Sequence, residues 1–310
     1  MEISIVIVNY NTHEHLIKCL DSININKDGI AIEIIVVDSN SPDRSIIDLS
    51  EKYKDVKFLF LDVNNGFGYG CNRGVDEAKG KYILLLNPDI IVTNNSLSNL
   101  YNYAENNPDA AGFTGLLMDE SNKLAYCYNN FPDLKWEMKE AFGIGAESFV
   151  NGLLARSEIK DNIPFDIDWA HGACFMIRKS VYEEINGFDE NIFLYYEDID
   201  IQKRLKSRGY RNVCIPSSKF YHFTRSSLTD EGSDKIYYFY MHKSKKYYLR
   251  KYFNVYTYYL INAVYILAYL TKIPLLPFRK KFRGIKVAKL NHYFIILGVY
   301  TKYCEKFDSN

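Results

Sequence analysis

The first 90 residues alternate between short apolar runs and amphipathic stretches. The four runs are rich in β-branched residues and leucine and occupy positions 3–8, 32–37, 56–61 and 82–86. Their continuous apolar character is typical of strands that are buried on both faces. The stretches between them carry apolar residues at helical spacing, and the strands recur at about the length of one strand–helix–strand unit. This pattern predicts an α/β fold with a mainly parallel central sheet.

Beyond residue 90 the pattern is less regular. The periodic segments that remain predict a helix over 96–106, strands over 110–116 and 173–177, and helices from 180 and over 198–207. We expect one more short strand from Arg211 that stops at Pro216. Residues 119–165 contain several prolines and glycines and are interpreted as a long irregular loop over a cleft.

The C-terminal part differs from the rest of the chain. Residues 252–271 form 20 residues without a charge, which is long enough to span a bilayer. Asparagines and six tyrosines interrupt this run, and basic residues on both sides leave its orientation open. We favour helices that lie in the membrane surface, with Pro274 and Pro277 breaking the path. A membrane span and a soluble core are the alternatives.

The formal net charge is zero, but the charges are unevenly distributed. Residues 1–234 hold 23 Lys+Arg and 36 Asp+Glu, whereas residues 235–310 hold 15 Lys+Arg and two acids, so the two parts carry −13 and +13. An acidic body argues against a nucleic-acid binder. A basic, aromatic tail is typical of a surface for anionic lipid, and docking on the protein's own acidic body is the alternative.

The six cysteines form no C-x-x-C pair, which argues against a structural zinc site or a redox motif. Their number fits reduced thiols in a cytosol. The first apolar run is too short for a signal peptide. We therefore expect a cytoplasmic protein, peripheral on the inner face of the cell membrane.

Polar side chains follow the first two predicted strands. Tyr10 and Asn11 follow the first strand, and Asp38 and Asn40 follow the second. A tyrosine at such a position can stack on a base, and a carboxylate can accept a hydrogen bond from a base N–H or a ribose hydroxyl. Turn asparagines and a helix cap are the structural alternatives.

The next two strands also end in candidate binding segments. The third leads into a glycine-rich segment at 64–74, including Gly66 and Asn72, that opens a helix whose N–H groups favour anions. It does not follow the first strand, as a dinucleotide fingerprint would. The fourth strand leads to Asn87 and Asp89. One carboxylate and two diphosphate oxygens can hold Mg²⁺ or Mn²⁺, and a Pro-Asp turn is the alternative.

Three acids lie at the start of the helix over 198–207. Glu197, Asp198 and Asp200 there complement the helix dipole, with an Asp200–Arg204 pair at i, i+4. The functional alternative is a general base, because a carboxylate at a helix N-terminus stays ionised. His222 lies among aromatic residues and is either structural or a further metal ligand.

These motifs closely resemble family 2 glycosyltransferases of the GT-A fold, in a branch similar to the bacterial rhamnosyltransferases of cell-wall and O-antigen assembly. The resemblance covers roughly residues 1–225 and rests on V-I-V-N-Y-N (6–11), V-V-D-S-N-S (36–41), N-x-G-F-G-Y-G-x-N-x-G (64–74), N-P-D (87–89), H-G-A-C-F-M-I-R-K (171–179) and G-F-D-E-N-I-F-L-Y-Y-E-D-I-D (187–200). It implies a GT-A catalytic domain over 1–230 and a helical, membrane-associating region over 231–310.

The resemblance also implies roles for individual residues. Tyr10 and Asp38 match positions that bind the nucleotide base. Asp89 matches the last acid of the D-x-D metal motif, and Asp198 matches the catalytic base of the E-D motif. His222 matches a histidine near the metal or diphosphate. The remaining residues expected to bind substrate are Asn11, Asn40, Gly66, Asn72, Asn87, His171 and Glu197; Asn87 stands where the D-x-D motif has its first acid.

The implied enzyme is an inverting hexosyltransferase that uses Mn²⁺ or Mg²⁺. Its expected donor is a nucleotide diphosphate sugar, dTDP-L-rhamnose, and its expected acceptor is a lipid-linked saccharide. A homo-oligomer is also expected. A nucleotidyltransferase is one alternative, but it calls for a glycine-rich phosphate loop after the first strand. A catalytically silent membrane adaptor is the other.

Overall fold

The computed structural model describes residues 1–42, 45–144, 151–223, 231–278 and 286–302. The chain forms two compact units. The first, called here the sheet unit, comprises Met1–Phe131, Val150–Phe193 and Glu197–Ser227. The second, called the helical unit, comprises Pro132–Phe149, Leu194–Tyr196 and Leu228–Asn310. Two segments from the first 230 residues therefore belong with the C-terminal helices.

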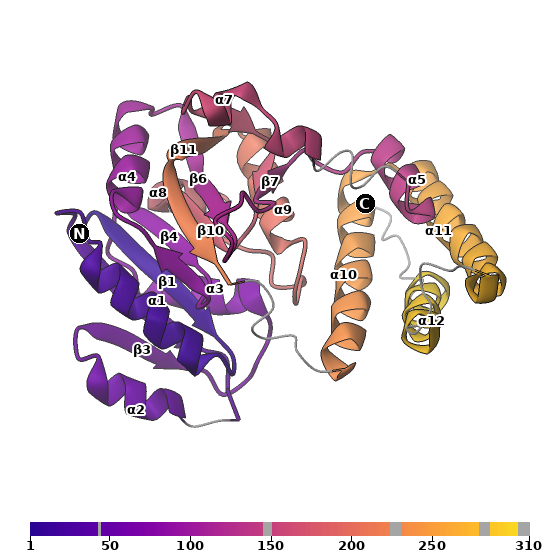
Figure 1. Cartoon of the computed structure of the whole chain (residues 1–310), viewed down its shortest axis with the longest axis horizontal. Helices are drawn as coiled ribbons and strands as arrows, with labels where there is room; N and C mark the ends of the chain where they lie inside the picture. The colour runs from indigo at the N-terminus through magenta and orange to yellow at the C-terminus, as the bar shows by residue number, and fades with distance from the viewer. Residues whose placement is uncertain (43–44, 145–150, 224–230, 279–285, 303–310) are drawn as a thin grey trace. The chain divides into compact units, whose positions relative to one another are not determined.

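The sheet unit is built on one large sheet (Figure 1) with strand order β3-β2-β1-β4-β10-β6-β11-β5 and with β8 paired to β11. Its strands are β1 (Ile3–Asn9), β2 (Ile32–Asp38), β3 (Val56–Phe60), β4 (Tyr82–Leu86), β5 (Ile90–Val92), β6 (Ala110–Met118), β8 (Phe165–Ile167), β10 (Cys174–Arg178) and β11 (Arg211–His222). Strands β1 to β4 are parallel, and β10 enters antiparallel between β4 and β6. The α/β fold with a mostly parallel central sheet is confirmed.

Helices cover both faces of this sheet. Consecutive residues of β1 from Ile3 to Ile7 point to alternate faces, and all of them are buried. The helices are α1 (His13–Ile25), α2 (Ser45–Lys52), α3 (Phe67–Asp76), α4 (Ser96–Asn106), α7 (Ser157–Lys160), α8 (Lys179–Glu184) and α9 (Glu197–Ser207). Helix α3 packs closely on β1, since a Cβ added at Gly74 would lie 2.4 Å from Val6 Cγ1. The glycines of α3 therefore allow close helix–sheet packing, in addition to the anion binding that the sequence suggested.

Two predictions about the first 230 residues are wrong. Strand β11 does not stop at Pro216 but continues to His222, because a register shift between Cys214 and Lys219 accommodates the proline. Residues 119–165 are not one irregular loop. They contain β7 (Tyr128–Asn129), which pairs with β9 (Trp169–Ala170), as well as α5 (Leu134–Phe142), α7 and the start of β8.

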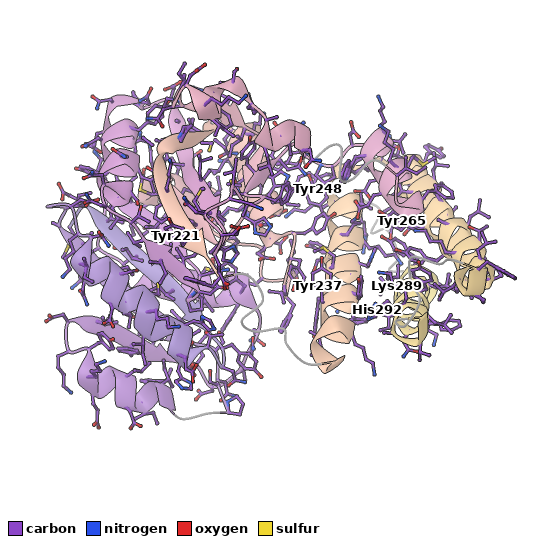
Figure 2. All side chains as sticks on the ribbon, viewed as in Figure 1. Tyr221, Tyr237, Tyr248, Tyr265, Lys289 and His292 are labelled. Carbon is purple, nitrogen blue, oxygen red and sulfur yellow. The ribbon has the colours of Figure 1, made fainter. Side chains whose placement is uncertain are left out.

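The helical unit packs α5 with α10 (Glu231–Tyr252), α11 (Val255–Leu275), the 3-10 turn η1 (Leu276–Phe278) and α12 (Lys286–Lys302). Pro274 lies in the last turn of α11, and Pro277 lies in η1. Tyrosines dominate its core, including Tyr248 on α10 and Tyr265 on α11 (Figure 2). The basic segment 279–283 and Cys304 lie outside the described residues; the other five cysteines are free thiols, and all are buried.

Candidate active site

The topology brings the candidate residues to one edge of the sheet. Strands β1, β2 and β4 are parallel, so the carboxyl ends that carry Asn9, Asp38 and Asp89 share an edge. Strand β10 is antiparallel to β4, so its amino end, which follows His171, lies at the same edge. Strand β11 pairs with β5 and places His222 opposite the first residue of β5, next to Asp89. Ligands of open α/β sheets bind at such an edge.

Asp38 joins the loops that follow β1 and β2. Its carboxylate is buried and accepts hydrogen bonds from Asn9 Nδ2 at 2.8 Å and from the N–H and Oγ of Ser41 at 2.9 and 2.6 Å. The N–H of Asn11 donates to the same Ser41 Oγ at 3.0 Å. Tyr10 on this double loop is 46% exposed, so its ring is available for stacking.

The backbone of these two loops requires special residues. Asn11 and Asn40 adopt φ of +54° and +59°, in the left-handed region that asparagine tolerates better than most residues. The four predicted residues Tyr10, Asn11, Asp38 and Asn40 therefore lie together. The sequence interpretation of Asn11 and Asn40 as turn residues also holds, so they shape the loops as well as flank the site.

Asp89 and His222 form a pair at the adjoining strand ends. His222 Nε2 lies 3.5 Å from Asp89 Oδ1, and both side chains are only about a tenth exposed. The described residues contain no group of three His, Cys, Asp or Glu side chains that would hold a metal by itself. A carboxylate oxygen and an imidazole nitrogen suit Mn²⁺, and a site with two protein ligands leaves positions for diphosphate oxygens.

Asp198 is held at the N-terminus of α9. Its Oδ2 accepts the N–H of Gly172 at 3.0 Å, and its Oδ1 accepts the N–H of Ile199 at 2.9 Å. A Cβ on Gly172 would lie 3.3 Å from Asp198 Cβ, so glycine permits this close approach. The carboxylate is therefore fixed beside the turn that precedes β10.

Burial changes the protonation expected for Asp198. It raises the pKa of the carboxyl, although His171 and the N–H groups of Gly172 and Ile199 lower it. Burial therefore opposes the effect of the helix N-terminus, whose N–H groups favour the ionised form. A carboxylate with a raised pKa is a better proton acceptor.

His171 connects Asp198 with the Asp89–His222 pair. Its ring stacks on Trp169 with centroids 6.0 Å apart. Burial lowers the pKa of His171, the nearby Asp198 raises it, and His222 lowers it. Asp198 and His222 therefore both lie within electrostatic reach of His171.

Glu197 lies behind Asp198 rather than in a solvated position. It is 6% exposed, and burial together with the charge of Asp198 raises its pKa well above the ordinary value. Glu197 also contributes to the raised pKa of buried Cys71 in α3, after burial itself. The negative charge of Asp198 therefore disfavours a second negative charge on Glu197.

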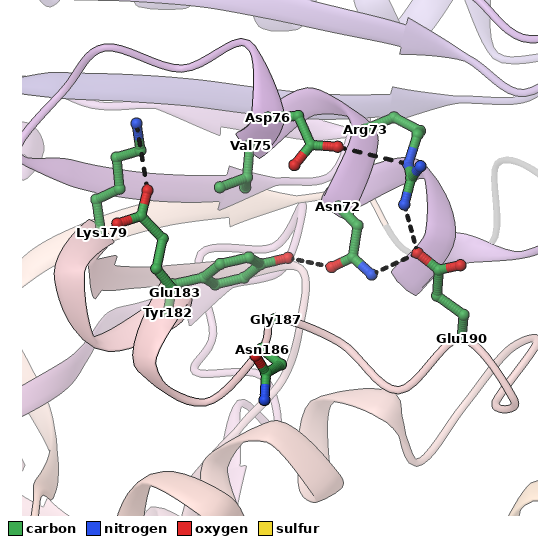
Figure 3. Close-up of a pocket in the computed structure, with 10 residues that line it drawn as sticks. All are labelled: Asn72, Arg73, Val75, Asp76, Lys179, Tyr182, Glu183, Asn186, Gly187 and Glu190. Carbon is green, nitrogen blue, oxygen red and sulfur yellow. Dashed lines mark hydrogen bonds and ion pairs between the residues drawn. The ribbon is translucent and has the colours of Figure 1, made fainter.

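Asn72 is occupied by protein partners. Its Oδ1 accepts from Tyr182 Oη at 2.5 Å and from the N–H of Phe188 at 2.9 Å, and its Nδ2 donates to Phe188 O and to Glu190 Oε1. It lines a pocket of about 410 Å³ (Figure 3), in which Arg73 also pairs with Glu190. The prediction that Asn72 binds substrate is not supported by this geometry, because its hydrogen-bonding capacity is used.

Gly66 and Asn87 act through their backbones. Gly66 has φ of +101°, and an added Cβ would lie 2.0 Å from the carbonyl oxygen of Phe193. The N–H of Asn87 donates to Ala173 O at 2.9 Å and ties the end of β4 to the turn before β10. Both residues shape the edge of the site.

Gln202 is a residue of the site that the sequence interpretation missed. It is fully buried on α9, and its amide bonds both backbone groups of Ala170 at 2.7 Å and the carbonyl of Asp198 at 3.0 Å. It thereby fixes α9 against β9, next to His171. Its position four residues after Asp198 could have identified it, because residues i and i+4 share one face of a helix.

Two family models and several curated proteins match the chain. The chain matches the family Glycosyl transferase family 2 over residues 4–186, and N-terminal domain of galactosyltransferase over residues 156–226. It is 31% identical over 229 residues to rhamnosyltransferase WbbL of Escherichia coli (strain K12), covering 71% of this chain and 82% of that protein. It is 25% identical over 230 residues to the N-acetylglucosaminyl-diphospho-decaprenol L-rhamnosyltransferase of Mycobacterium tuberculosis, covering 70% and 75%.

A solved structure shares the fold. The mannosyltransferase PcManGT from Pyrobaculum calidifontis, in complex with GDP-Man and Mn²⁺, superposes with a TM-score of 0.60 at 13% identity, covering 98% of this chain and 88% of that chain. This likeness confirms the GT-A fold. The family match spans more than half of the chain, which makes the protein an enzyme rather than a silent adaptor and argues against a nucleotidyltransferase. The chain is a glycosyltransferase and belongs to glycosyl transferase family 2.

Proposed function

We propose that this protein transfers L-rhamnose from dTDP-L-rhamnose, with inversion at the anomeric carbon, to a lipid-linked saccharide at the inner face of the cell membrane. The observation that carries the proposal is the position of Asp198, which two backbone N–H groups hold beside His171 at the edge that carries Asp38 and Asp89. We infer the sugar from the two relatives, which are both named rhamnosyltransferases. We infer the lipid-linked acceptor from the name of the mycobacterial relative.

Asp198 is the proposed general base. Its carboxylate takes the proton of the acceptor hydroxyl as that oxygen attacks the anomeric carbon, and the bond from this carbon to the diphosphate oxygen breaks. A single displacement of this kind inverts the configuration. The raised pKa of Asp198, caused first by burial, moves the carboxylate towards the basicity that the step needs.

The donor is held by residues of the sheet unit. Tyr10 stacks on the base, and Asp38 accepts a hydrogen bond from the base or ribose. Asp89 and His222 would hold the divalent cation, Mn²⁺ or Mg²⁺, which would offset negative charge on the leaving diphosphate. Their separation of 3.5 Å supports this assignment, because both side chains can reach one ion.

The proposed base is tested with Asp198→Asn, which keeps the size of the side chain. Transfer should fall by about 10²–10⁴-fold, while dTDP-L-rhamnose still shifts the melting temperature of the protein. Asp55→Asn makes the same change at an exposed carboxylate before β3 and should transfer normally. Normal transfer by Asp198→Asn would refute the assignment of Asp198 as the general base. Stabilisation by another nucleotide sugar, and not by dTDP-L-rhamnose, would refute the proposed donor.

The proposed membrane contact uses α11. The exposed apolar and aromatic side chains of α11 and of the following turn η1 form what we call the α11 stripe: Val255, Tyr256, Tyr259, Leu260, Leu267, Leu270, Leu275 and Phe278. Tyr256 and Phe278, near its two ends, are 85% and 82% exposed. The C-terminal part carries the excess of basic residues, which favours anionic lipid.

We favour a helix that lies on the membrane over one that crosses it. Val255–Phe278 is long and apolar enough to cross, but only by length and composition. The middle of α11 carries Tyr265, which bonds to buried Lys245 at 2.9 Å and to buried Glu137 at 2.8 Å. Crossing the bilayer would carry these ionisable groups into hydrocarbon, which is costly.

The membrane contact is tested by flotation with vesicles of phosphatidylcholine, with and without phosphatidylglycerol. Leu267→Glu places an acid in the α11 stripe and should abolish flotation with the anionic vesicles. Ile25→Glu makes the same kind of change at an exposed position of α1 and should float normally. Equal flotation of both variants would refute the stripe as the contact, and transfer to a water-soluble acceptor should persist in both.

A further inference from the structure

The segment Leu194–Tyr196 links the two units through the chain. These three residues belong to the helical unit, whereas Phe193 before them and Glu197 after them belong to the sheet unit. Asp198 is thus only two residues from a segment that the helical unit holds. A single residue, Glu197, separates the segment from Asp198.

This segment is strained. Tyr195 and Tyr196 have φ of +65° and +69°, in the left-handed region. Bulky L-residues rarely adopt this conformation, and two in succession rarely do so in the absence of strong restraint. Such strain persists only where the surrounding structure holds it, and it is typical of functional sites.

Helix α10 contacts each of the three residues of this segment. Ser244 Oγ donates to the carbonyl of Leu194 at 2.8 Å. The ring of Tyr195 packs edge-on against Tyr237, with centroids 5.1 Å apart. Tyr196 is 7% exposed and packs against Tyr248 at 5.4 Å. Positions 237, 244 and 248 are seven and four apart, so they lie on one face of α10; Figure 2 shows Tyr237 and Tyr248 on that helix.

The residue before the segment is fixed independently. The carbonyl of Phe193 accepts the N–H of Phe67 at 3.0 Å, at the start of α3. No side chain fits at Gly66, because its Cβ would lie 2.0 Å from that carbonyl oxygen. The segment is therefore bounded by the fixed carbonyl of Phe193 before it and by helix α9 after it.

We propose that α10 positions the catalytic carboxylate of Asp198 by holding Leu194–Tyr196 in its strained conformation. Ser244, Tyr237 and Tyr248 are then positioning residues, and the helical unit contributes to catalysis as well as to attachment. The proposal rests on Asp198 being the base. It implies that loosening α10 lowers kcat but leaves donor binding unchanged, because Tyr10 and Asp38 lie on other loops.

The test uses the full chain with Ser244→Ala and Tyr237→Leu. We expect kcat to fall by about tenfold or more in each, because a small displacement of a catalytic group costs up to ~10²-fold. The Kd of dTDP-L-rhamnose should not change. Tyr237→Phe keeps the ring contact and should restore kcat. Thr301→Ala removes a hydroxyl that bonds within its own helix α12 and is the matched control.

The outcomes separate this inference from the proposed function. Unchanged kcat in Ser244→Ala and Tyr237→Leu, alongside an inactive Asp198→Asn, would overturn the positioning role alone. An active Asp198→Asn would instead remove the base on which the inference rests. A parallel loss of kcat, donor affinity and melting temperature would also overturn it, because it would show a general loss of folding.

Discussion

The two units have cores of opposite character. The core of the sheet unit is built mainly from isoleucine, valine and leucine on strands and helices. The core of the helical unit is built largely from tyrosines, and it contains Lys245 and Glu137 at 1% and 0% exposure. Lys245 Nζ lies 2.5 Å from Glu140 Oε1 and 3.5 Å from Glu137 Oε2. The core of the sheet unit is therefore held by apolar packing, whereas the core of the helical unit also contains buried ion pairs.

This difference has consequences for what holds each unit together. Apolar packing loses stability in proportion to the cavity or overlap that a substitution creates. A buried ion pair adds little net stability, but the loss of one partner leaves an uncompensated charge. The helical unit should therefore tolerate apolar changes in its exposed stripe and be vulnerable at Lys245.

The largest expected effect is that of Lys245→Met. We expect the helical unit to lose about 3–5 kcal/mol of stability, because Glu137 is left buried without its cation. The two tryptophans allow the units to be followed separately: Trp136 lies in α5 and Trp169 lies in β9. Denaturant melts in a Trp169→Phe background report on the helical unit, and melts in a Trp136→Phe background report on the sheet unit.

The pH dependence of Lys245→Met checks its cause. Burial raises the pKa of Glu137, so a proton on this acid favours the folded state. That contribution is fully present below the ordinary glutamate pKa and is lost as pH rises through the raised one. The defect of Lys245→Met should therefore be smaller at pH 5 than at pH 8. Lys245→Met with Glu137→Gln should recover most of the loss; a defect independent of pH would point to packing instead.

The same difference explains what the sequence could predict. The first four strands and the helix over 96–106 were predicted because their apolar periodicity is local. The association of α5 with the C-terminal helices was not predicted, because Glu137 and Lys245 are 108 positions apart and neither is unusual in its own segment. The grouping of Asp38 with Asp89 followed from strand order, and the role of Asp198 followed from the family resemblance. Gln202 and the strained tyrosines depend on contacts that no periodicity encodes.

A smaller effect is expected from Gly74→Ala in the sheet unit. The new Cβ would lie 2.4 Å from Val6 Cγ1 and 3.0 Å from Val37 Cγ2, so α3 or two strands must shift. Overpacking of this kind costs about 1–3 kcal/mol. The loss should appear in the Trp169 signal. A stable Gly74→Ala variant would mean that the sheet unit adapts more readily than its dense packing implies.

The smallest effect is expected from Gly298→Ala, the matched change in α12 of the helical unit. A Cβ there would meet no atom of the described residues within 4 Å, so no overlap opposes it. Alanine in place of a helical glycine removes backbone entropy from the unfolded chain and should stabilise by about 0.5–1 kcal/mol. The Trp136 signal should therefore shift to higher denaturant while Gly74→Ala shifts the Trp169 signal to lower denaturant. A loss of stability in both variants would mean that the helical unit is as tightly packed as the sheet unit. The two cores would then differ in their polar groups but not in how tightly they are packed.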